Sequence, residues 1–123
     1  DMVGRLNPQR KMVVVNGIGT SKYWKRRVKR IKPDTSELKI NTTEGGIGAS
    51  DHTSFYLTNI PAVHIFSGQH REYHMPEDDV ELINYEGMET IENYTVKLMC
   101  KLPKRRRKFT PTKNSIPFLS CLV

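Results

Sequence analysis

A run of four apolar residues near the start of the chain most limits the folds that this sequence can adopt. Residues 12–15 are one methionine and three valines without a polar interruption. β-Branched side chains favour extended backbone, and a continuous apolar run of this length is typical of a strand that is buried on both faces. The sequence therefore predicts a buried strand over residues 11–16, which needs other elements packed around it.

Helical periodicity follows this strand. Trp24, Val28 and Ile31 recur at three- and four-residue spacing, and lysines and arginines fill most positions between them. This pattern predicts an amphipathic helix over residues 22–31. Pro33 is expected to end it, because proline has no backbone N–H to continue the helical hydrogen bonds.

Two more helices are predicted in the second half of the chain. Ser50 and Asp51 have the residue types of a helix start, with Ser50 as N-cap and Asp51 complementing the helix dipole, and this short helix extends to Leu57. A longer amphipathic helix is predicted within residues 80–102, where apolar or weakly polar residues keep helical spacing. Those residues are Tyr85, Met88, Ile91, Thr95, Leu98, Met99 and Leu102.

Two further segments have the pattern of strands. Residues 37–41 alternate polar and apolar side chains, and residues 61–66 form a short, mostly apolar run. Strands and helices therefore alternate along the chain, which argues for an α/β fold with helices packed on a β-sheet. Residues 103–123 combine basic residues and prolines without a clear period. They are predicted to be a tail or linker after a domain that spans residues 1–102.

The positive charge is concentrated in two segments. The chain has 20 basic and 13 acidic residues, a net charge of +7, and residues 22–32 and 101–113 hold seven basic residues each and no acid. The rest of the chain is therefore acidic overall. A solvated helix face and a basic tail explain these segments, and an anionic partner is the alternative. No aromatic or motif signature accompanies them, so nucleic-acid binding is not expected.

The cysteines and the hydropathy of the chain bear on disulfides, metal binding and membrane insertion. Cys100 and Cys121 are the only cysteines, which allows at most one disulfide and forms no metal-binding pattern. Cys100 falls within the helical pattern of residues 80–102, so a free, buried thiol is predicted there. No apolar run is long enough to span a membrane, so no membrane segment is expected.

Polar, ionisable residues occur next to three predicted strand ends. They are Asp1, the sequence Ser50-Asp51-His52, and the segment 68–79, which holds two histidines and four acidic residues. In an α/β sheet such segments can converge in one crevice. Aspartate, histidine and glutamate without cysteine suit Zn²⁺ or a similar divalent ion. The alternative for residues 68–79 is a polar surface loop.

Together these segments resemble the C-terminal half of the peptidase domain in the M28 family of zinc aminopeptidases. The resemblance covers residues 1–102, and two motifs in this order carry most of it: Ser-Asp-His at residues 50–52, and Tyr-His-x-Pro-x-Asp at residues 73–78. The sequences Asp-Met-Val-Gly-Arg at residues 1–5 and Ile-Pro-Ala-Val at residues 60–63 fit as well. The resemblance implies a partial three-layer α/β sandwich, with helices packed on a mostly parallel or mixed sheet.

The resemblance also implies a catalytic centre with two zinc ions. Asp1 would bind one zinc and His74 the other, while Asp51 would support a catalytic glutamate. The resemblance places Asp78 so that it holds either the loop or the imidazole of His74. Three more residues would line the pocket or brace the loop: Tyr73, His70 and Ser50. His52 is either a packing or a hydrogen-bonding residue, and His64 is expected to be a satisfied core or sheet-face histidine.

The sequence departs from the family pattern in its missing ligands. The His-x-Asp and Glu-Glu sequences of the family are absent, so only about one ligand per metal is present, whereas zinc sites usually have at least three protein ligands. The resemblance therefore predicts a fragment, inactive alone and lacking the N-terminal half of its domain. Its substrate would be a peptide or protein with a free N-terminus, and the intact protein would be exported: periplasmic, extracellular or membrane-anchored. Alternatives are a non-catalytic M28-like domain and a glutaminyl-cyclase-like acyltransferase.

Overall fold

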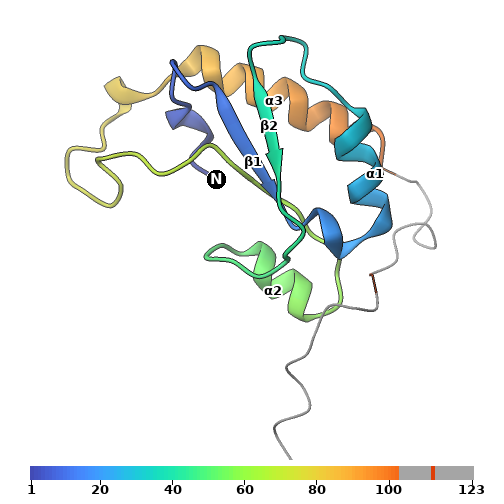
Figure 1. Cartoon of the computed structure of the whole chain (residues 1–123). Coiled ribbons are helices and arrows are strands. Elements are labelled where there is room, and N and C mark those ends of the chain that lie inside the picture. The colour runs from blue at the N-terminus through green and yellow to red at the C-terminus, as the bar shows by residue number, and fades with distance from the viewer. Residues whose placement is uncertain (103–111, 113–123) are drawn as a thin grey trace, which may run out of the picture.

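The structure is a computed structural model that describes residues 1–102 and Thr112, and it has a small sheet with helices beside it (Figure 1). The alternation of strands and helices predicted from the sequence is confirmed. The strands are β1 (Met12–Asn16), β2 (Lys39–Thr42) and β3 (His64–Phe66), and the α-helices are α1 (Lys22–Arg30), α2 (His52–Leu57) and α3 (Tyr85–Cys100). Short 3₁₀ helices are η1 (Val3–Arg5), η2 (Ile18–Thr20) and η3 (Val80–Leu82).

The three strands form one mixed sheet in the order β2-β1-β3. β1 runs parallel to β2, with Val13 opposite Ile40, and antiparallel to β3, with Val15 opposite Ile65. The carboxyl ends of β1 and β2 therefore meet the start of β3 at one edge of the sheet. The α/β class and the mixed sheet expected from the sequence are confirmed.

The core lies on one face of β1. Val13 and Val15 are completely buried, and they pack with residues of α1 and α3, including Trp24 and Ile91. Side chains alternate between the two faces of a strand, so Val14 points to the opposite face, where it is only half-buried. The prediction that this strand is buried on both faces is wrong for that face, because both long helices pack against the same side.

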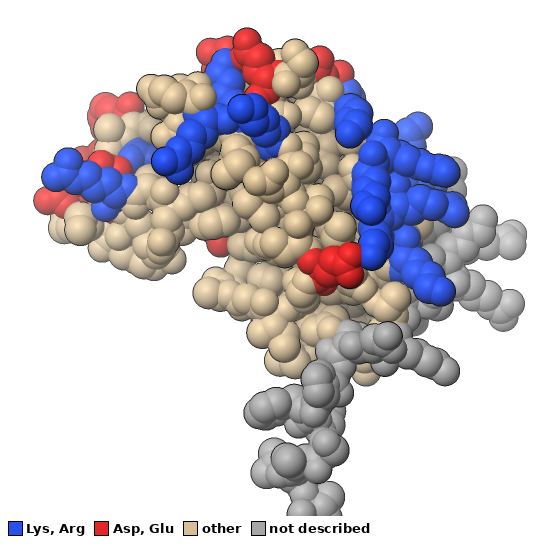
Figure 2. Space-filling model, in the orientation of Figure 1, with Lys and Arg blue, Asp and Glu red and all other residues tan. Residues whose placement is uncertain are grey.

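Helix α1 exposes its basic side. Ser21 caps the helix by accepting a hydrogen bond from the backbone N–H of Tyr23. Figure 2 shows lysine and arginine side chains gathered over this helix, and six of the seven basic residues in 22–32 are exposed. Lys25 makes an ion pair with Glu44. The basic segment is thus a solvated helix face, as the sequence indicated, while most of the second basic segment lies outside the described residues.

Helix α2 starts one or two residues later than predicted. Its cap position is Asp51, which has no capping hydrogen bond from its side chain, and Ser50 is not the N-cap. The backbone of Asp51 is already helical, at φ −57° and ψ −22°, so the chain turns before the helix begins. The hydroxyl of Thr53 instead donates to the carbonyl of Gly48 and accepts from its N–H, at 2.6 and 2.8 Å.

The end of helix α3 is more exposed than the sequence predicted, with Met99 60% exposed. Cys100 is a free thiol, but it is exposed rather than buried. It follows the buried Leu98 by two positions, or about 200° around the helix, and so points away from the core. Cys121 lies outside the described residues. Among the helices that the structure describes, none is both long and apolar enough to cross a membrane.

Tyr94 on α3 provides a test of the core through its alkaline titration. Its side chain is completely buried, and its hydroxyl has no hydrogen-bond partner in the described part of the chain. Burial raises the pKa of this phenol from 10.0 to about 12. Between these values the unfolded chain releases the proton first, so stability falls as the pH rises.

We expect Tyr94→Phe to remove this dependence. Between pH 9 and pH 12, the free energy of unfolding of the wild type should fall by roughly 2–3 kcal/mol relative to that of the variant. Near pH 7 the variant should be equally stable or more stable by about 1 kcal/mol, because an unpaired buried hydroxyl is lost. Urea unfolding of both proteins over this pH range measures the difference. An equal loss of stability in the two proteins would contradict a raised pKa of Tyr94.

Candidate functional site

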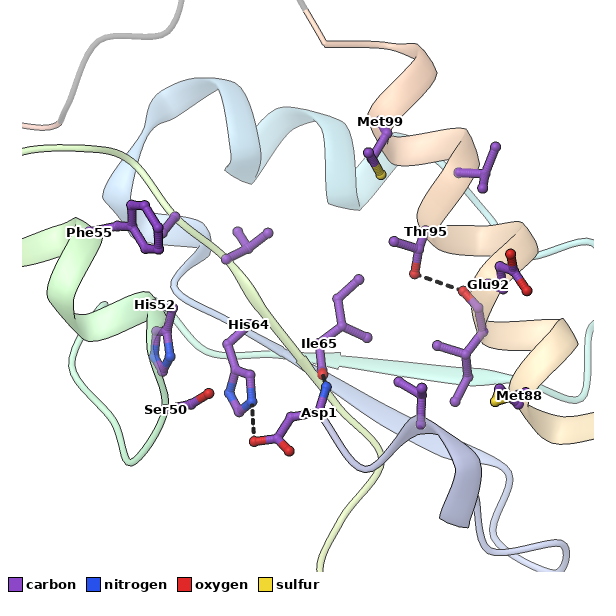
Figure 3. A pocket seen from close by; sticks show the side chains of 15 residues that line it. Asp1, Ser50, His52, Phe55, His64, Ile65, Met88, Glu92, Thr95 and Met99 are labelled. Atoms are coloured by element: carbon purple, nitrogen blue, oxygen red, sulfur yellow. Dashed lines mark hydrogen bonds and ion pairs between the residues drawn. The ribbon is translucent and has the colours of Figure 1, made fainter. Parts of the chain in front are cut away.

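Polar side chains meet at the edge where β1 and β2 end and β3 begins. A cavity of about 380 Å³ lies there. A second, mostly apolar cavity of about 710 Å³ lies between this edge and α3 (Figure 3). Asp1, His52 and His64 line both cavities. Phe55 from α2 and Met99 from α3 line only the larger cavity. The carboxyl ends of parallel strands are the usual position of ligand sites in open α/β sheets.

The backbone of Asp1 pairs with the outer edge of β3. Its α-amino group donates to the carbonyl of Ile65 at 2.7 Å, and the N–H of Ser67 lies 3.4 Å from its carbonyl oxygen. These contacts position the Asp1 side chain beside the imidazole of His64, whose Nε2 is 3.1 Å from Asp1 Oδ2 (Figure 3). Asp1 is therefore fixed by both its backbone and its carboxylate.

His64 is satisfied on the sheet, as predicted, but it also contacts Asp1. Its Nδ1 lies 3.3 Å from Nδ2 of Asn16, the residue opposite it on β1. The hydroxyl of Thr43 donates to Oδ1 of Asn16 at 2.7 Å. Burial lowers the pKa of His64. The sequence prediction missed the contact with Asp1; the only signal was a histidine inside an otherwise apolar strand.

His52 is a packing residue. Its ring is buried and stacks on His64, with ring centroids 4.7 Å apart and planes at 11°. Neither ring nitrogen has a hydrogen-bond partner among the described residues. Burial, and then the neighbouring His64, lower the pKa of His52. Gly48 allows this packing, because a Cβ atom there would lie only 3.1 Å from Cε1 of His52.

Residues 68–79 form an exposed loop that is anchored at some distance from His74. Asp78 lies 3.0 Å from Nε2 of His70 and 3.6 Å from a guanidinium nitrogen of Arg5, and Arg5 also pairs with Glu72. Of the two alternatives for Asp78, the structure thus shows it holding the loop; no contact between Asp78 and His74 is found in the described residues. The loop is attached to η1, the turn that follows Asp1.

His74 itself is exposed and has a left-handed backbone, at φ 60°. Histidine adopts this conformation less readily than glycine, and such residues cluster at functional sites. Its ring lies against Tyr73, with centroids 3.9 Å apart. Tyr73 lines the smaller cavity, so His74 adjoins the site without being part of the cavity wall.

The remaining candidates are distributed unevenly around these cavities. Ser50 lines the larger cavity together with Asp1. Asp51 is exposed and is not among the residues that line either cavity. His70 is braced against Asp78 and packs edge-on against Tyr73, at 6.0 Å between ring centroids. The structure therefore brings Asp1, Ser50 and Tyr73 to the cavities, and leaves Asp51 outside them.

The donor atoms match zinc in kind but not in number. Carboxylate and imidazole are zinc ligands, and Oδ1 of Asp1 has no hydrogen-bond partner in the described part of the chain. Within residues 1–102 and Thr112, however, no group of three or more histidine, cysteine, aspartate or glutamate side chains is arranged to hold a metal ion. The described residues by themselves supply only part of a metal site.

Carboxylate and imidazole groups thus lie where β1 and β2 end, which is the usual position of a ligand site in an open α/β sheet. Comparison with protein-family models gives a match to peptidase family M28 over residues 1–99. The chain therefore belongs to peptidase family M28, a family of hydrolases, as its motifs indicated. Comparisons with curated proteins and with solved structures found no match.

Proposed function

We propose that this chain is part of a zinc-dependent aminopeptidase, which hydrolyses the first peptide bond of a peptide or protein with a free N-terminus. The observation that carries this proposal is the position of Asp1 in a chain of family M28. Its carboxylate lies on the wall of the cavity at the carboxyl ends of β1 and β2. One oxygen lies within hydrogen-bond distance of His64, and the other has no hydrogen-bond partner among the residues that the structure describes. A carboxylate oxygen in such a position is a suitable zinc ligand.

Two residues of this chain would hold the metal, Asp1 for one zinc ion and His74 for the other. Bound zinc supplies a water of lowered pKa and polarises the substrate carbonyl. Because zinc sites usually have at least three protein ligands, we propose that residues outside this sequence supply the others, including a His-x-Asp and a Glu-Glu sequence. The 123-residue chain alone is then inactive.

The other residues of the site shape it rather than bind metal. Arg5 holds the loop of His74 through Glu72 and Asp78, and so fixes the distance of that loop from Asp1. His52 stacks on His64, and both rings line the two cavities. Asp51 remains exposed next to α2, where it would support a glutamate supplied from outside this sequence.

The experiment compares two proteins on the same substrates. One is the 123-residue chain, and the other is the natural reading frame that encodes it, expressed with the codons upstream of Asp1. Aminoacyl-p-nitroanilides are offered with and without an N-acetyl group, in the presence of zinc and after treatment with a chelator. We expect hydrolysis only by the longer protein, only with zinc, and only of substrates with a free amino group.

Other outcomes would contradict particular parts of the proposal. Zinc-dependent release of an N-terminal residue by the 123-residue chain would show that its own ligands suffice. Equal cleavage of acetylated substrates would exclude an aminopeptidase. If the longer protein instead cyclises N-terminal glutamine, it is an acyltransferase, and if it has neither activity, it is a non-catalytic member of the family.

A further inference from the structure

We propose that His64 is a positioning residue that orients the carboxylate of Asp1. It does so within a chain of hydrogen bonds in which Thr43 donates to Asn16, Asn16 donates to His64, and His64 donates to Asp1. The proposal rests on the proposed function only where it takes Asp1 as a metal ligand. The chain engages Oδ2 of Asp1 and leaves Oδ1 for the ligand that the cavity receives.

The direction of the chain follows from which groups can donate. An ionised carboxylate only accepts, so Nε2 of His64, 3.1 Å from Asp1 Oδ2, must carry a proton. In a neutral imidazole Nδ1 is then an acceptor, and it faces the amide Nδ2 of Asn16 at 3.3 Å. With its NH₂ group turned to His64, Asn16 presents Oδ1 to the hydroxyl of Thr43, which donates at 2.7 Å. Each donor meets an acceptor, and no other arrangement of a neutral ring does so.

The sheet itself builds this alignment. Thr43 follows the last residue of β2, Asn16 ends β1, His64 begins β3, and Asp1 pairs with the outer edge of β3. Asn16 and His64 are direct partners in the antiparallel register. The four side chains therefore follow the strand order of the sheet, and the backbone ladder holds them in a row.

The ring of His64 has little freedom to turn. Its side chain is only 14% exposed, and one ring face is covered by His52 from α2. Phe66 lies nearby on the same strand, with a centroid distance of 5.6 Å. By contrast, the side chain of Asp1 is 39% exposed and depends on His64 for its orientation. Hydrogen-bond partners of metal ligands commonly change metal affinity by 10–100-fold when removed.

The first measurement is the tautomer of His64 in the 123-residue chain labelled with ¹⁵N-histidine. Long-range ¹H–¹⁵N spectra at neutral pH should show a neutral ring protonated at Nε2. Asn16→Leu should keep this tautomer, because the carboxylate of Asp1 still requires the proton on Nε2, but it should shift the ¹⁵N signal of Nδ1, which loses its donor. A ring protonated at Nδ1 in the wild-type chain would overturn the proposal. This readout requires neither metal nor activity.

The second measurement is zinc binding by the longer protein, which contains the codons upstream of Asp1, and by two variants of it, followed by competition with a chromogenic chelator. His64→Phe keeps an aromatic ring for stacking but removes the donor, and it should weaken zinc binding by about 10–100-fold. His64→Gln restores an N–H near the position of Nε2 and should bind within about threefold of wild type. Equal zinc affinity of wild type and His64→Phe would overturn the proposal, as would equal losses in both variants.

The variant Asp1→Asn distinguishes a failure of this proposal from a failure of the proposed function. If Asp1→Asn leaves zinc affinity unchanged, Asp1 is not a zinc ligand, and the proposed function loses the observation on which it rests. The ¹³Cγ shift of Asp1 then decides the present proposal: it should change in His64→Phe and return toward the wild-type value in His64→Gln. If the ¹³Cγ shift of Asp1 is the same in all three proteins, Asp1 and His64 are not hydrogen-bonded and the proposal is wrong.

Discussion

Asp1→Asn in the longer, zinc-dependent protein is expected to lower the release of N-terminal residues by more than about 100-fold, because it changes a charged ligand into a neutral amide. A loss of this size is larger than the loss caused by removing only a hydrogen-bond partner of a ligand. His74→Ala should have an effect of the same order. The measurement is kcat/KM for an aminoacyl-p-nitroanilide at saturating zinc, together with the zinc content of each purified protein.

His70→Gln is the matched control for His74→Ala, since both histidines lie in the loop 68–79. His70 contacts Asp78 and Tyr73 and is not placed as a ligand, so its replacement should loosen the loop and cost less than about tenfold in kcat/KM. Thermal unfolding checks that all variants fold. Activity of Asp1→Asn within tenfold of wild type would remove Asp1 from the metal site.

Ile91→Ala is expected to destabilise the chain by about 2–5 kcal/mol, because it empties space in the core against β1. Ile91 is 1% exposed and packs with Val13 and Val15. Met99, on the same helix and in the same predicted apolar stripe, is 60% exposed. Met99→Ala should therefore cost less than about 0.5 kcal/mol. Urea unfolding of the two variants measures both values.

The comparison between these two positions tests which side of α3 faces the sheet. A cost for Met99→Ala similar to that for Ile91→Ala would show that the side chain of Met99 is buried in solution and that the larger cavity is closed there. A small cost for Ile91→Ala would place the core elsewhere. Both variants keep residues of high helix propensity, so changes in the helix itself contribute little.

Local patterns predicted the elements of this fold well. The valine run, the three-residue and four-residue spacing of Trp24 and Val28, and the long periodic stretch all correspond to elements of the structure. These features depend on side chains that are close in sequence, so the sequence alone carries them. The same holds for the Ser-Asp-His and Tyr-His-x-Pro-x-Asp motifs, which indicated family M28 before any geometry was known, and the family match confirms that indication.

The errors concern contacts between elements. Val14 is half-buried because α1 and α3 share one face of the sheet, and periodicity does not tell on which face a helix packs. Ser50 does not cap α2, since the preceding glycine-rich loop already turns the chain at Asp51. Cys100 is exposed because its helix position, rather than its apolar character, decides its direction.

By itself the sequence determined the order of strands and helices, the family, and the residue types available for a metal site, because each depends on local spacing or on short motifs. Only the tertiary structure decided which of those residues meet. It placed Asp1 beside His64, 63 positions away, through pairing with β3, and it tied Asp78 to Arg5 and His70. Contacts of this kind arise from strand register and loop anchoring, which bring together residues that no sequence period relates.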